Sequence, residues 1–338
     1  MEHGMAKTVR FHELGPADVL RIEELPVGEP GPGEVLIQVA AFGINRSEVQ
    51  MRTGEYPLVD AQLPSGLGKE AVGFIRAIGP DVDDFVTGER VATLPCFDMS
   101  EYSVYAEQAI VPAFSLVRPP DSLPNTLAAA VWQQYLTAYG PLVLYSNLQE
   151  GDAVLITAAT SSVGTGAIRM AKMLGANVIA TTRSGEKAQA LLDTGADHAV
   201  VTSTENLVER VHEITNGEGA RVILDPISGP ILEELVACAS YRGAIFLYGR
   251  LDSRPTLFPL VQAMTKAVAV QGYTLWEIVN DDQIKERAVA DINNWTGEGR
   301  LTPQIDRIFE LDDIVEAHRY MESNQQVGKI VVRVNSPG

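Results

Sequence analysis

The spacing of apolar residues changes part-way along the chain. From Met5 to about Ser122, short alternating or clustered apolar runs are separated by Gly and Pro turns, which is typical of a β-rich domain. After a boundary at Asp121–Pro124 and an amphipathic helix expected over Leu127–Tyr139, apolar strands alternate with stretches of helical spacing. This alternation predicts an open parallel sheet. We expect the last apolar run, Lys329–Val334, to return to the β-rich domain.

The clearest strand–helix–strand pattern runs from Asp152 to Lys187. Ala153–Thr157 predicts a buried parallel strand, Val163–Leu174 has the spacing of a helix that packs on it, and Asn177–Thr182 predicts the next strand. Further strands are expected at His198–Val201, Arg221–Asp225, Gly243–Gly249 and Val268–Tyr273. In such a unit the turn after the first strand brings the N-terminus of the helix to the pyrophosphate of a dinucleotide.

The turn between this strand and its helix departs from the usual G-x-G-x-x-G pattern. Ala159 and Ser161 occupy the first two glycine positions, and Gly164 keeps the third. Small side chains still let the backbone approach a phosphate, and Gly164 still lets the helix pack against the strand. The pattern therefore predicts that Ser161, Ser162, Val163 and Gly164 bind the pyrophosphate. The alternative is a plain strand–helix corner in an α/β sheet.

The residues after the second strand bear on which nucleotide binds. An NAD site has an Asp or Glu about 20 residues after the turn, to bind the ribose 2′-hydroxyl. Here the sequence reads Thr182-Arg183-Ser184, with Lys187 one helical turn further, and these cations suit a 2′-phosphate. We therefore expect these four residues to bind NADPH rather than NADH. The alternative is that Arg183 and Lys187 are solvated charges in an acidic chain, and the nearby Glu186 favours that alternative slightly.

Composition narrows the class of partner. The 338 residues suit two domains, and 46% apolar and 21% charged residues are ordinary values for a globular protein. The formal net charge of −18 disfavours a nucleic-acid partner, whose phosphates require clustered Lys and Arg. Cys96 and Cys238 cannot form a disulfide framework, the N-terminal residues are polar, and no apolar run reaches the about 18 residues that span a bilayer. We expect a cytoplasmic protein with a small-molecule substrate and no membrane partner.

Several short segments, taken together, indicate one protein family. They are residues 43–48, 52–57, 63–71, 136–139, 158–164 and 195–198. With them the chain resembles the zinc-free quinone oxidoreductase branch of the medium-chain dehydrogenase/reductase superfamily, the relatives of zeta-crystallin. The resemblance implies an α/β fold with a GroES-like, β-barrel-type catalytic domain at 1–125 and 268–338. It also implies a Rossmann doubly wound parallel sheet at 126–267 and a homodimer. We expect Val268–Tyr273 to be the edge strand along which two copies pair.

The zinc-dependent members of this family carry their catalytic metal on cysteines or acids and a histidine. In this chain Asn45 stands near the first ligand position, and Lys69 stands where the histidine would precede Glu70. A protonated ammonium cannot ligate zinc, and the four-cysteine structural lobe is absent too, so we expect no metal. Without a Lewis acid, oxidation of a simple alcohol is difficult. The resemblance then implies hydride transfer from NADPH to a quinone or an α,β-unsaturated carbonyl. The alternatives are an enoyl-thioester reductase and a non-catalytic NADPH-binding protein.

By resemblance, Asn45, Glu48 and Tyr56 line the site beside the nicotinamide. Asn45 is a candidate hydrogen-bond donor to the substrate oxygen as negative charge develops there. Tyr56 is a candidate proton donor, and Lys69 a candidate fixed positive charge in place of the metal. Each has a plainer alternative. Asn45 can be a turn residue, Tyr56 a packed aromatic, and Lys69 a loop lysine that pairs with Glu70 or Glu48.

Two further residues are expected to contact the cofactor. Thr137 matches a family position that contacts the nicotinamide ribose or carboxamide; its alternative is a helix residue that bonds its own backbone. Gly249 ends the fifth parallel strand, where strand ends face the cofactor crevice of an open α/β sheet.

Overall fold

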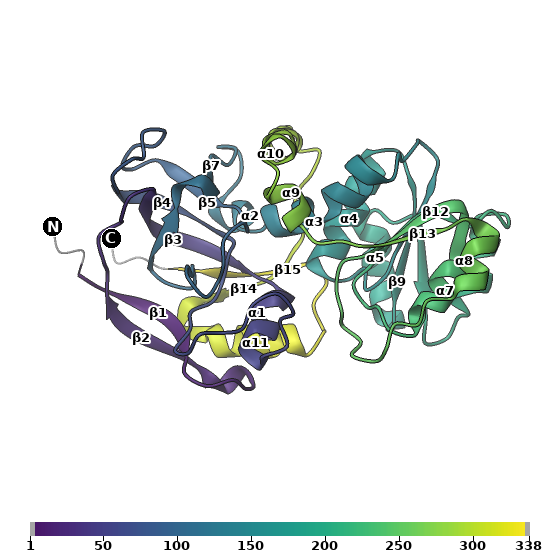
Figure 1. Ribbon diagram of the computed structural model, residues 1–338, viewed down its shortest axis with the longest axis horizontal. Helices are drawn as coiled ribbons and strands as arrows, with labels where there is room; N and C mark the ends of the chain where they lie inside the picture. The colour runs from purple at the N-terminus through teal and green to yellow at the C-terminus, as the bar shows by residue number, and fades with distance from the viewer. Residues whose placement is uncertain (1–3, 335–338) are drawn as a thin grey trace. The chain divides into compact units, whose positions relative to one another are not determined.

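The computed structural model describes residues 4–334 and divides by its contacts into two compact units (Figure 1). The first unit comprises Met1–Gln133 and Asn293–Gly338, and the second comprises Gln134–Ile292. Each unit has a sheet and a hydrophobic core of its own.

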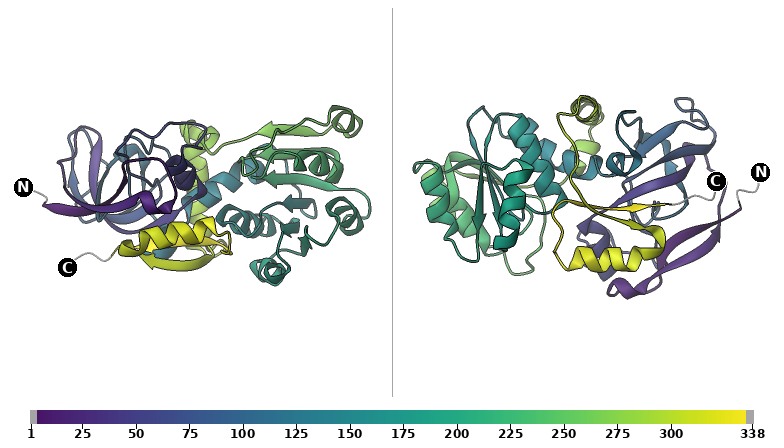
Figure 2. Two further views of the ribbon diagram at one scale, coloured as in Figure 1. Left: turned by 90° about the horizontal axis from the view of Figure 1, so that it is seen from below. Right: turned by 180° about the vertical axis from the view of Figure 1, so that it is seen from behind.

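A six-stranded parallel sheet forms the second unit. Its order is β10-β9-β8-β11-β12-β13, and every neighbouring pair is parallel. The strands are β8 (Ala153–Ile156), β9 (Asn177–Thr182), β10 (His198–Val201), β11 (Ala220–Asp225), β12 (Ala239–Leu247) and β13 (Ala269–Gly272). Helices cover both faces (Figure 2); they include α4 (Ser162–Met173), α5 (Ala188–Thr194), α6 (Leu207–Ile214), α7 (Ile231–Cys238) and α8 (Leu260–Lys266). The order reverses between β8 and β11, which confirms the predicted doubly wound sheet.

Burial on both faces explains why the central strand is continuous in apolar residues. Val154, Leu155 and Ile156 of β8 are fully buried, as expected for a strand with a parallel neighbour on each side. Helix α4 ends just before Gly175, whose φ of 84° lies in the left-handed region that favours glycine. The sequence pattern predicts the end of this helix at Leu174, the C-cap residue of α4.

The predicted limits of the inserted domain, 126–267, differ from the division that the contacts give. At the C-terminal end the reason is β13, which hydrogen-bonds to β12 and extends the second unit's sheet beyond residue 267. At the N-terminal end residues 126–133 pack with the first unit. The expected single helix over Leu127–Tyr139 is wrong: α2 (Asn125–Ala128) and α3 (Trp132–Tyr139) are separate helices. No Gly or Pro lies between them to mark the break.

The first unit is built on a mainly antiparallel sheet of the expected GroES-like, β-rich kind. Its order is β14-β15-β3-β4-β5-β7, and β6 also pairs with β3; β1 and β2 form a separate hairpin. The strands are β1 (Met5–Phe11), β2 (Leu20–Pro26), β3 (Glu34–Ile44), β4 (Ala71–Ile78), β5 (Arg90–Thr93), β6 (Gln108–Pro112), β7 (Leu116–Val117), β14 (Ile305–Glu310) and β15 (Lys329–Arg333). The pairing of β15 with β3 (Figure 1) confirms that the last strand returns to this domain.

Most helices outside the parallel sheet are short. The first unit carries α1 (Arg46–Thr53) and α11 (Ile314–Glu322), and α9 (Trp276–Val279) belongs to the second unit. The longest helix of the described residues is α10 (Asp282–Gly297), with 16 residues. Within residues 4–334, no helix combines the length and the apolar character that crossing a membrane requires.

His318 of α11 makes the stability of the first unit depend on pH. Its ring is fully buried, lies edge-on to Tyr105, and has no hydrogen-bond partner at either nitrogen among the described residues. Burial, and then the charges of Arg52 and Arg46, lower the pKa of His318 from 6.5 to about 3. Below pH 6.5 the unfolded chain therefore binds a proton that the folded chain does not. The stability that the folded protein has with a neutral His318 is therefore complete above pH 6.5, and it is lost as the pH falls toward about 3.

We expect the free energy of unfolding to fall by up to about 1.4 kcal/mol per pH unit through His318 alone. In His318→Gln, which cannot gain a proton, that part of the slope should be missing. Urea unfolding of both proteins between about pH 4 and about pH 7 measures the difference. Parallel stability curves for the two proteins would show that His318 does not titrate in this way.

Candidate active site

The turn between β8 and α4 forms a compact N-terminus for the helix. Ser161 is the N-cap of α4, and its Oγ accepts the Gly164 N–H over 3.1 Å. A Cβ on Gly164 would lie 2.5 Å from the Ala159 carbonyl oxygen, so the close approach of helix and turn requires glycine there. The first N–H groups of an α-helix have no intrahelical acceptor. They can bind an anionic group, and the small side chains of the turn fit a pyrophosphate.

The segment after β9 lies beside this turn. The Ala159 N–H donates to the Thr181 carbonyl over 3.1 Å, and β8 and β9 are parallel neighbours. The Ser184 N–H donates to the Thr182 hydroxyl over 3.2 Å, which shapes the bend. Arg183 is exposed and forms no hydrogen bond or ion pair within residues 4–334. Lys187 closes the short helical turn that follows. A guanidinium group that no other residue engages suits a phosphate ligand.

Gly249 lies at the same carboxyl edge of the sheet, just after β12. A Cβ on Gly249 would lie 2.8 Å from the Pro226 carbonyl oxygen. Beside it, the fully buried Asp225 ends β11 and accepts hydrogen bonds from the Thr157 hydroxyl and, over 2.6 Å, from the Ser228 N–H. Burial raises the pKa of Asp225. Sequence reasoning did not identify Asp225 as part of this edge, because a lone Asp after a strand is also a common turn residue.

Thr137 lies in α3 and is 6% exposed. Helix α3 packs on α4: a Cβ on Gly166 would lie 2.7 Å from the Gln134 side-chain oxygen. The predicted contact of Thr137 with the nicotinamide half of a cofactor stays a prediction.

Asn45 joins β3 to α1 in the first unit. It is the N-cap of α1 with an extended backbone, yet its side chain does not cap the helix. Its Oδ1 accepts a hydrogen bond from Lys329 Nζ over 2.6 Å, and its Nδ2 donates to Glu48 Oε1 over 3.3 Å. The side chain is therefore engaged in a buried polar cluster, and only the backbone serves the turn.

Lys69 and Tyr56 form a pair. Lys69 is 3% exposed, its Nζ donates to the Tyr56 hydroxyl over 3.3 Å, and it lies 5.5 Å from the centre of that ring. Tyr56 is half-buried. The structure thus brings together two of the three predicted catalytic residues. An ammonium beside a phenol stabilises the phenolate that forms when a proton leaves.

Lys329 is the residue that sequence reasoning missed. The first residue of β15, it is fully buried, and its Nζ lies 2.5 Å from Glu70 Oε2. Glu70, which the sequence offered as a partner of Lys69, is thus held by a lysine 259 positions away. In the sequence, Lys329 is a single charged residue at the start of an apolar strand, and a lysine in that position is usually exposed to solvent.

Glu48 completes this cluster. It is fully buried and accepts hydrogen bonds from Asn45 and, over 3.2 Å, from Ser47 Oγ. Burial raises the pKa of Glu48, and the charges of Lys329 and Lys69 offset that rise in part. Glu48 therefore holds a proton at a higher pH than an exposed glutamate does.

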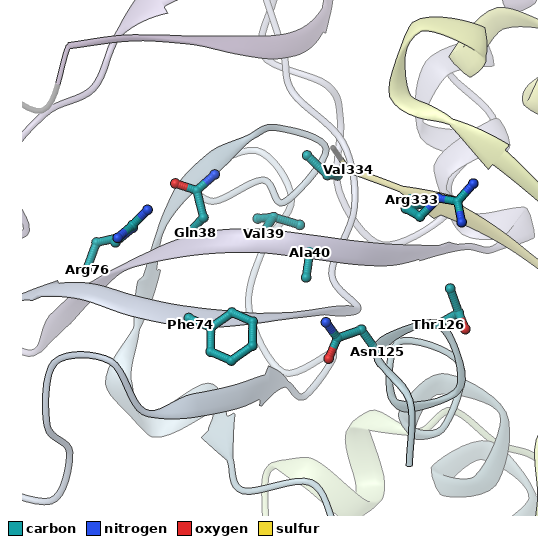
Figure 3. Close-up of a pocket in the computed structure, with 9 residues that line it drawn as sticks. All are labelled: Gln38, Val39, Ala40, Phe74, Arg76, Asn125, Thr126, Arg333 and Val334. Carbon is teal, nitrogen blue, oxygen red and sulfur yellow. The ribbon is translucent and has the colours of Figure 1, made fainter. Parts of the chain in front are cut away.

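A pocket of about 480 Å³ lies elsewhere on the first unit. Side chains of β3, β4, α2 and the end of β15 line it (Figure 3); they are Gln38, Val39, Ala40, Phe74, Arg76, Asn125, Thr126, Arg333 and Val334. None of the predicted site residues lies among them. The candidate residues lie instead in the buried cluster of the first unit and at the strand edge of the second.

Two family models match the chain. The model described as "Alcohol dehydrogenase GroES-like domain" matches residues 31–121. The model described as "Zinc-binding dehydrogenase" matches residues 162–293. The two matches lie on the β-rich part and on the parallel-sheet part of the chain, respectively.

The second description names zinc, but the buried cluster does not fit a zinc ion. Lys329 Nζ occupies the space between Asn45 and Glu70, and Lys69 adds a second ammonium. Ammonium groups are donors only and repel a cation. In the part of the chain that the structure describes, no group of three or more His, Cys, Asp and Glu side chains could hold a metal ion.

Several relatives cover nearly the whole chain. It is 34% identical over 332 residues to a quinone oxidoreductase of Salmonella typhimurium, covering 96% of this chain and 98% of the relative. It is 29% identical over 333 residues to a 2-haloacrylate reductase of a Burkholderia species, covering 97% and 99%. The structure of Escherichia coli quinone oxidoreductase complexed with NADPH superposes with a TM-score of 0.89 at 27% identity, covering 97% and 99%. The chain belongs to the zeta-crystallin-like quinone oxidoreductase branch of the medium-chain dehydrogenase/reductase superfamily.

Proposed function

We propose that this chain is an NADPH-dependent reductase that transfers a hydride to a quinone or to an α,β-unsaturated carbonyl without a metal ion. The observation that carries the proposal is a set of polar side chains in the first unit: Asn45, which Lys329 holds, and the pair of Lys69 and Tyr56. It offers N–H and O–H donors where a metal would need thiolates and imidazoles. The names of the quinone oxidoreductase and 2-haloacrylate reductase relatives support the same chemistry.

Residues of the second unit would hold the cofactor. The N-terminus of α4, with the turn at Ser161, Ser162, Val163 and Gly164, would bind the pyrophosphate. Arg183 and Lys187, with Thr182 and Ser184, would bind the 2′-phosphate, and Thr137 and Gly249 would line the nicotinamide half. When bound, NADPH supplies a hydride from C4 of its nicotinamide ring.

Residues of the first unit would act on the acceptor. The Asn45 amide donates a hydrogen bond to the acceptor oxygen, where negative charge develops as the hydride arrives. Tyr56 then gives its hydroxyl proton to the reduced acceptor, and Lys69 stabilises the phenolate until solvent returns a proton. One hydride and one proton are consumed, so a quinone leaves as a hydroquinone and an enone as a saturated carbonyl compound.

The test is oxidation of NADPH by the purified wild-type protein with a panel of acceptors. The panel contains a benzoquinone, a simple enone, a 2-haloacrylate and an enoyl-thioester. We expect NADPH consumption with the quinone or the enone. Turnover of the thioester alone would instead favour an enoyl-thioester reductase. Binding of NADPH without turnover of any acceptor would favour a non-catalytic role.

We also propose that the protein is a homodimer that pairs through the second unit. Strand β13 is at the edge of the six-stranded sheet. The chain before it exposes a set of large apolar side chains, at 51% to 77% of their area: Leu257, Phe258, Leu260, Val261 and Met264. An unpaired strand edge beside exposed apolar side chains is typical of an interface between copies.

We expect Val261→Glu combined with Met264→Glu to convert the dimer into a folded monomer, because two carboxylates would have to be buried at the interface. Phe114, which is 62% exposed on the first unit, provides the control Phe114→Glu, and that variant should stay dimeric. Sedimentation velocity measures all three proteins. A monomeric wild-type protein would refute the proposal.

The cysteines suit a reducing compartment. Cys96 and Cys238 are both buried and form no disulfide in the described part of the chain. Burial raises the pKa of the Cys238 thiol to about 12, so this thiol is poorly reactive. We place the protein in the cytoplasm. Fractionation of the source cells should recover it with cytoplasmic markers, and recovery from another compartment would contradict this assignment.

A further inference from the structure

We propose that Lys329 is a positioning residue. It fixes the Asn45 side-chain amide so that the N–H donors are turned away from β15 and toward the substrate that accepts the hydride. The inference rests on the proposed role of Asn45 as a hydrogen-bond donor. It assigns to Lys329 a part in the reaction without any contact with substrate or cofactor.

The pairing of two strands brings these residues together. In the antiparallel pair of β15 and β3, Ile330 lies opposite Ile44, so Lys329 comes next to Asn45 at the end of the pair. Lys329 Nζ lies 2.6 Å from Asn45 Oδ1 and 2.5 Å from Glu70 Oε2. The other oxygen of Glu70 accepts the Gln133 N–H over 2.9 Å. Lys329 is thus held on its far side by a carboxylate that is itself fixed.

The chemistry of the ammonium decides which way the amide faces. A lysine ammonium has donors and no acceptor, so Asn45 must turn its oxygen toward Lys329. At the other end of the amide, Nδ2 gives one N–H to the Glu48 carboxyl group. The second N–H of Asn45 has no acceptor within residues 4–334. In a flipped amide, NH₂ would face an ammonium and the carbonyl oxygen would face the Glu48 carboxyl, which would lose both hydrogen bonds.

The backbone makes room for this arrangement at Gly43. A Cβ at this position would lie 2.4 Å from Lys329 Cε and 2.9 Å from Glu70 Oε2. Side-chain atoms this close would have to move. A buried lysine–glutamate pair adds little or nothing to stability compared with apolar residues of the same size. Here the pair of Lys329 and Glu70 specifies one orientation of the Asn45 amide.

A double-mutant cycle tests whether Lys329 acts through Asn45. All four enzymes carry Glu70→Gln, so that no buried carboxylate is left unpaired when Lys329→Met is introduced. The cycle compares Lys329 with Lys329→Met, once with Asn45 present and once with Asn45→Ala. Melting temperatures and NADPH affinities of the four proteins show whether the fold and the nucleotide site are retained.

With Asn45 present, we expect Lys329→Met to lower kcat by about tenfold or more with little change in the KM of the acceptor, because the donor is no longer oriented. In the Asn45→Ala background the same change should alter kcat by less than about twofold. Equal losses in both backgrounds would mean that Lys329 supports only the fold, and the inference would be overturned.

Failure of the proposed function gives a different result. If Asn45→Ala has the turnover of the wild-type protein, or if no acceptor is reduced at all, the role of Asn45 itself is wrong. If the Lys329→Met proteins do not fold, Gly43→Ala keeps every charge, and its Cβ would displace the Lys329 side chain. The same Cβ would lie 2.6 Å from the Ala129 carbonyl oxygen, so the melting temperature of this variant is measured first. Gly43→Ala should then lower kcat only where Asn45 is present, and a loss independent of Asn45 would overturn the inference.

Discussion

Asn45→Ala should lower kcat for quinone or enone reduction by about 100-fold to 1000-fold, the usual cost of removing one donor to a developing oxyanion. The affinity for NADPH should stay within about twofold, because the predicted nucleotide-binding residues lie in the other unit. Asn45→Asp should lose a similar amount, since an ionised carboxylate keeps the partner of Lys329 but has no hydrogen to donate. Steady-state kinetics with a fixed acceptor measure both variants.

The chain offers a matched control for this prediction. Asn294 belongs to the first unit and is exposed on α10, so Asn294→Ala should remove no buried contact. This variant should have the kcat of the wild-type protein. A kcat for Asn45→Ala within about threefold of the wild-type value would show that the amide does not donate in the transition state.

Arg183→Ala should weaken NADPH binding by about tenfold to 100-fold, which is about 1.4 to 2.8 kcal/mol. The reason is the loss of a charge-assisted contact with the 2′-phosphate. NADH has no phosphate at this position, so its Kd should change by less than about twofold. Arg183 is exposed and has no hydrogen-bond or ion-pair partner in the described part of the chain, so the change should leave folding intact. Isothermal titration of both nucleotides measures the difference.

Two further variants sharpen this comparison. Glu186 follows the same bend and is exposed, and Glu186→Gln should strengthen NADPH binding slightly by removing a like charge. Arg210 lies on α6 and pairs with Glu205 and Glu213, so Arg210→Ala is a control that should leave both affinities unchanged. Equal losses for NADPH and NADH in Arg183→Ala would defeat the phosphate argument.

The parallel-sheet half of the fold could be predicted closely because its signals are local. Strands β9 and β10 have the predicted bounds, and β8 differs by one residue. A strand buried on both faces appears in the sequence as an unbroken apolar run. The break between α2 and α3 left no such signal, because every residue there is compatible with a continuous helix.

The candidate catalytic cluster was only partly predictable because its contacts join residues that are far apart in the sequence. The sequence marked Asn45, Tyr56 and Lys69 one by one, but the partner of Asn45 is 284 positions away. A single buried lysine in an apolar strand gives no sign of its partner until the strand pairing is known. The contact of Lys69 with Tyr56 likewise depends on how two loops fold back on each other.

The proposed reaction depends most on NADPH binding at the Ser161 turn. Isothermal titration of the wild-type protein with NADPH, and then with NADH, tests it most directly. We predict one NADPH bound per chain, with at least about tenfold higher affinity than NADH. No heat of binding with NADPH, or equal affinity for the two nucleotides, would contradict the account.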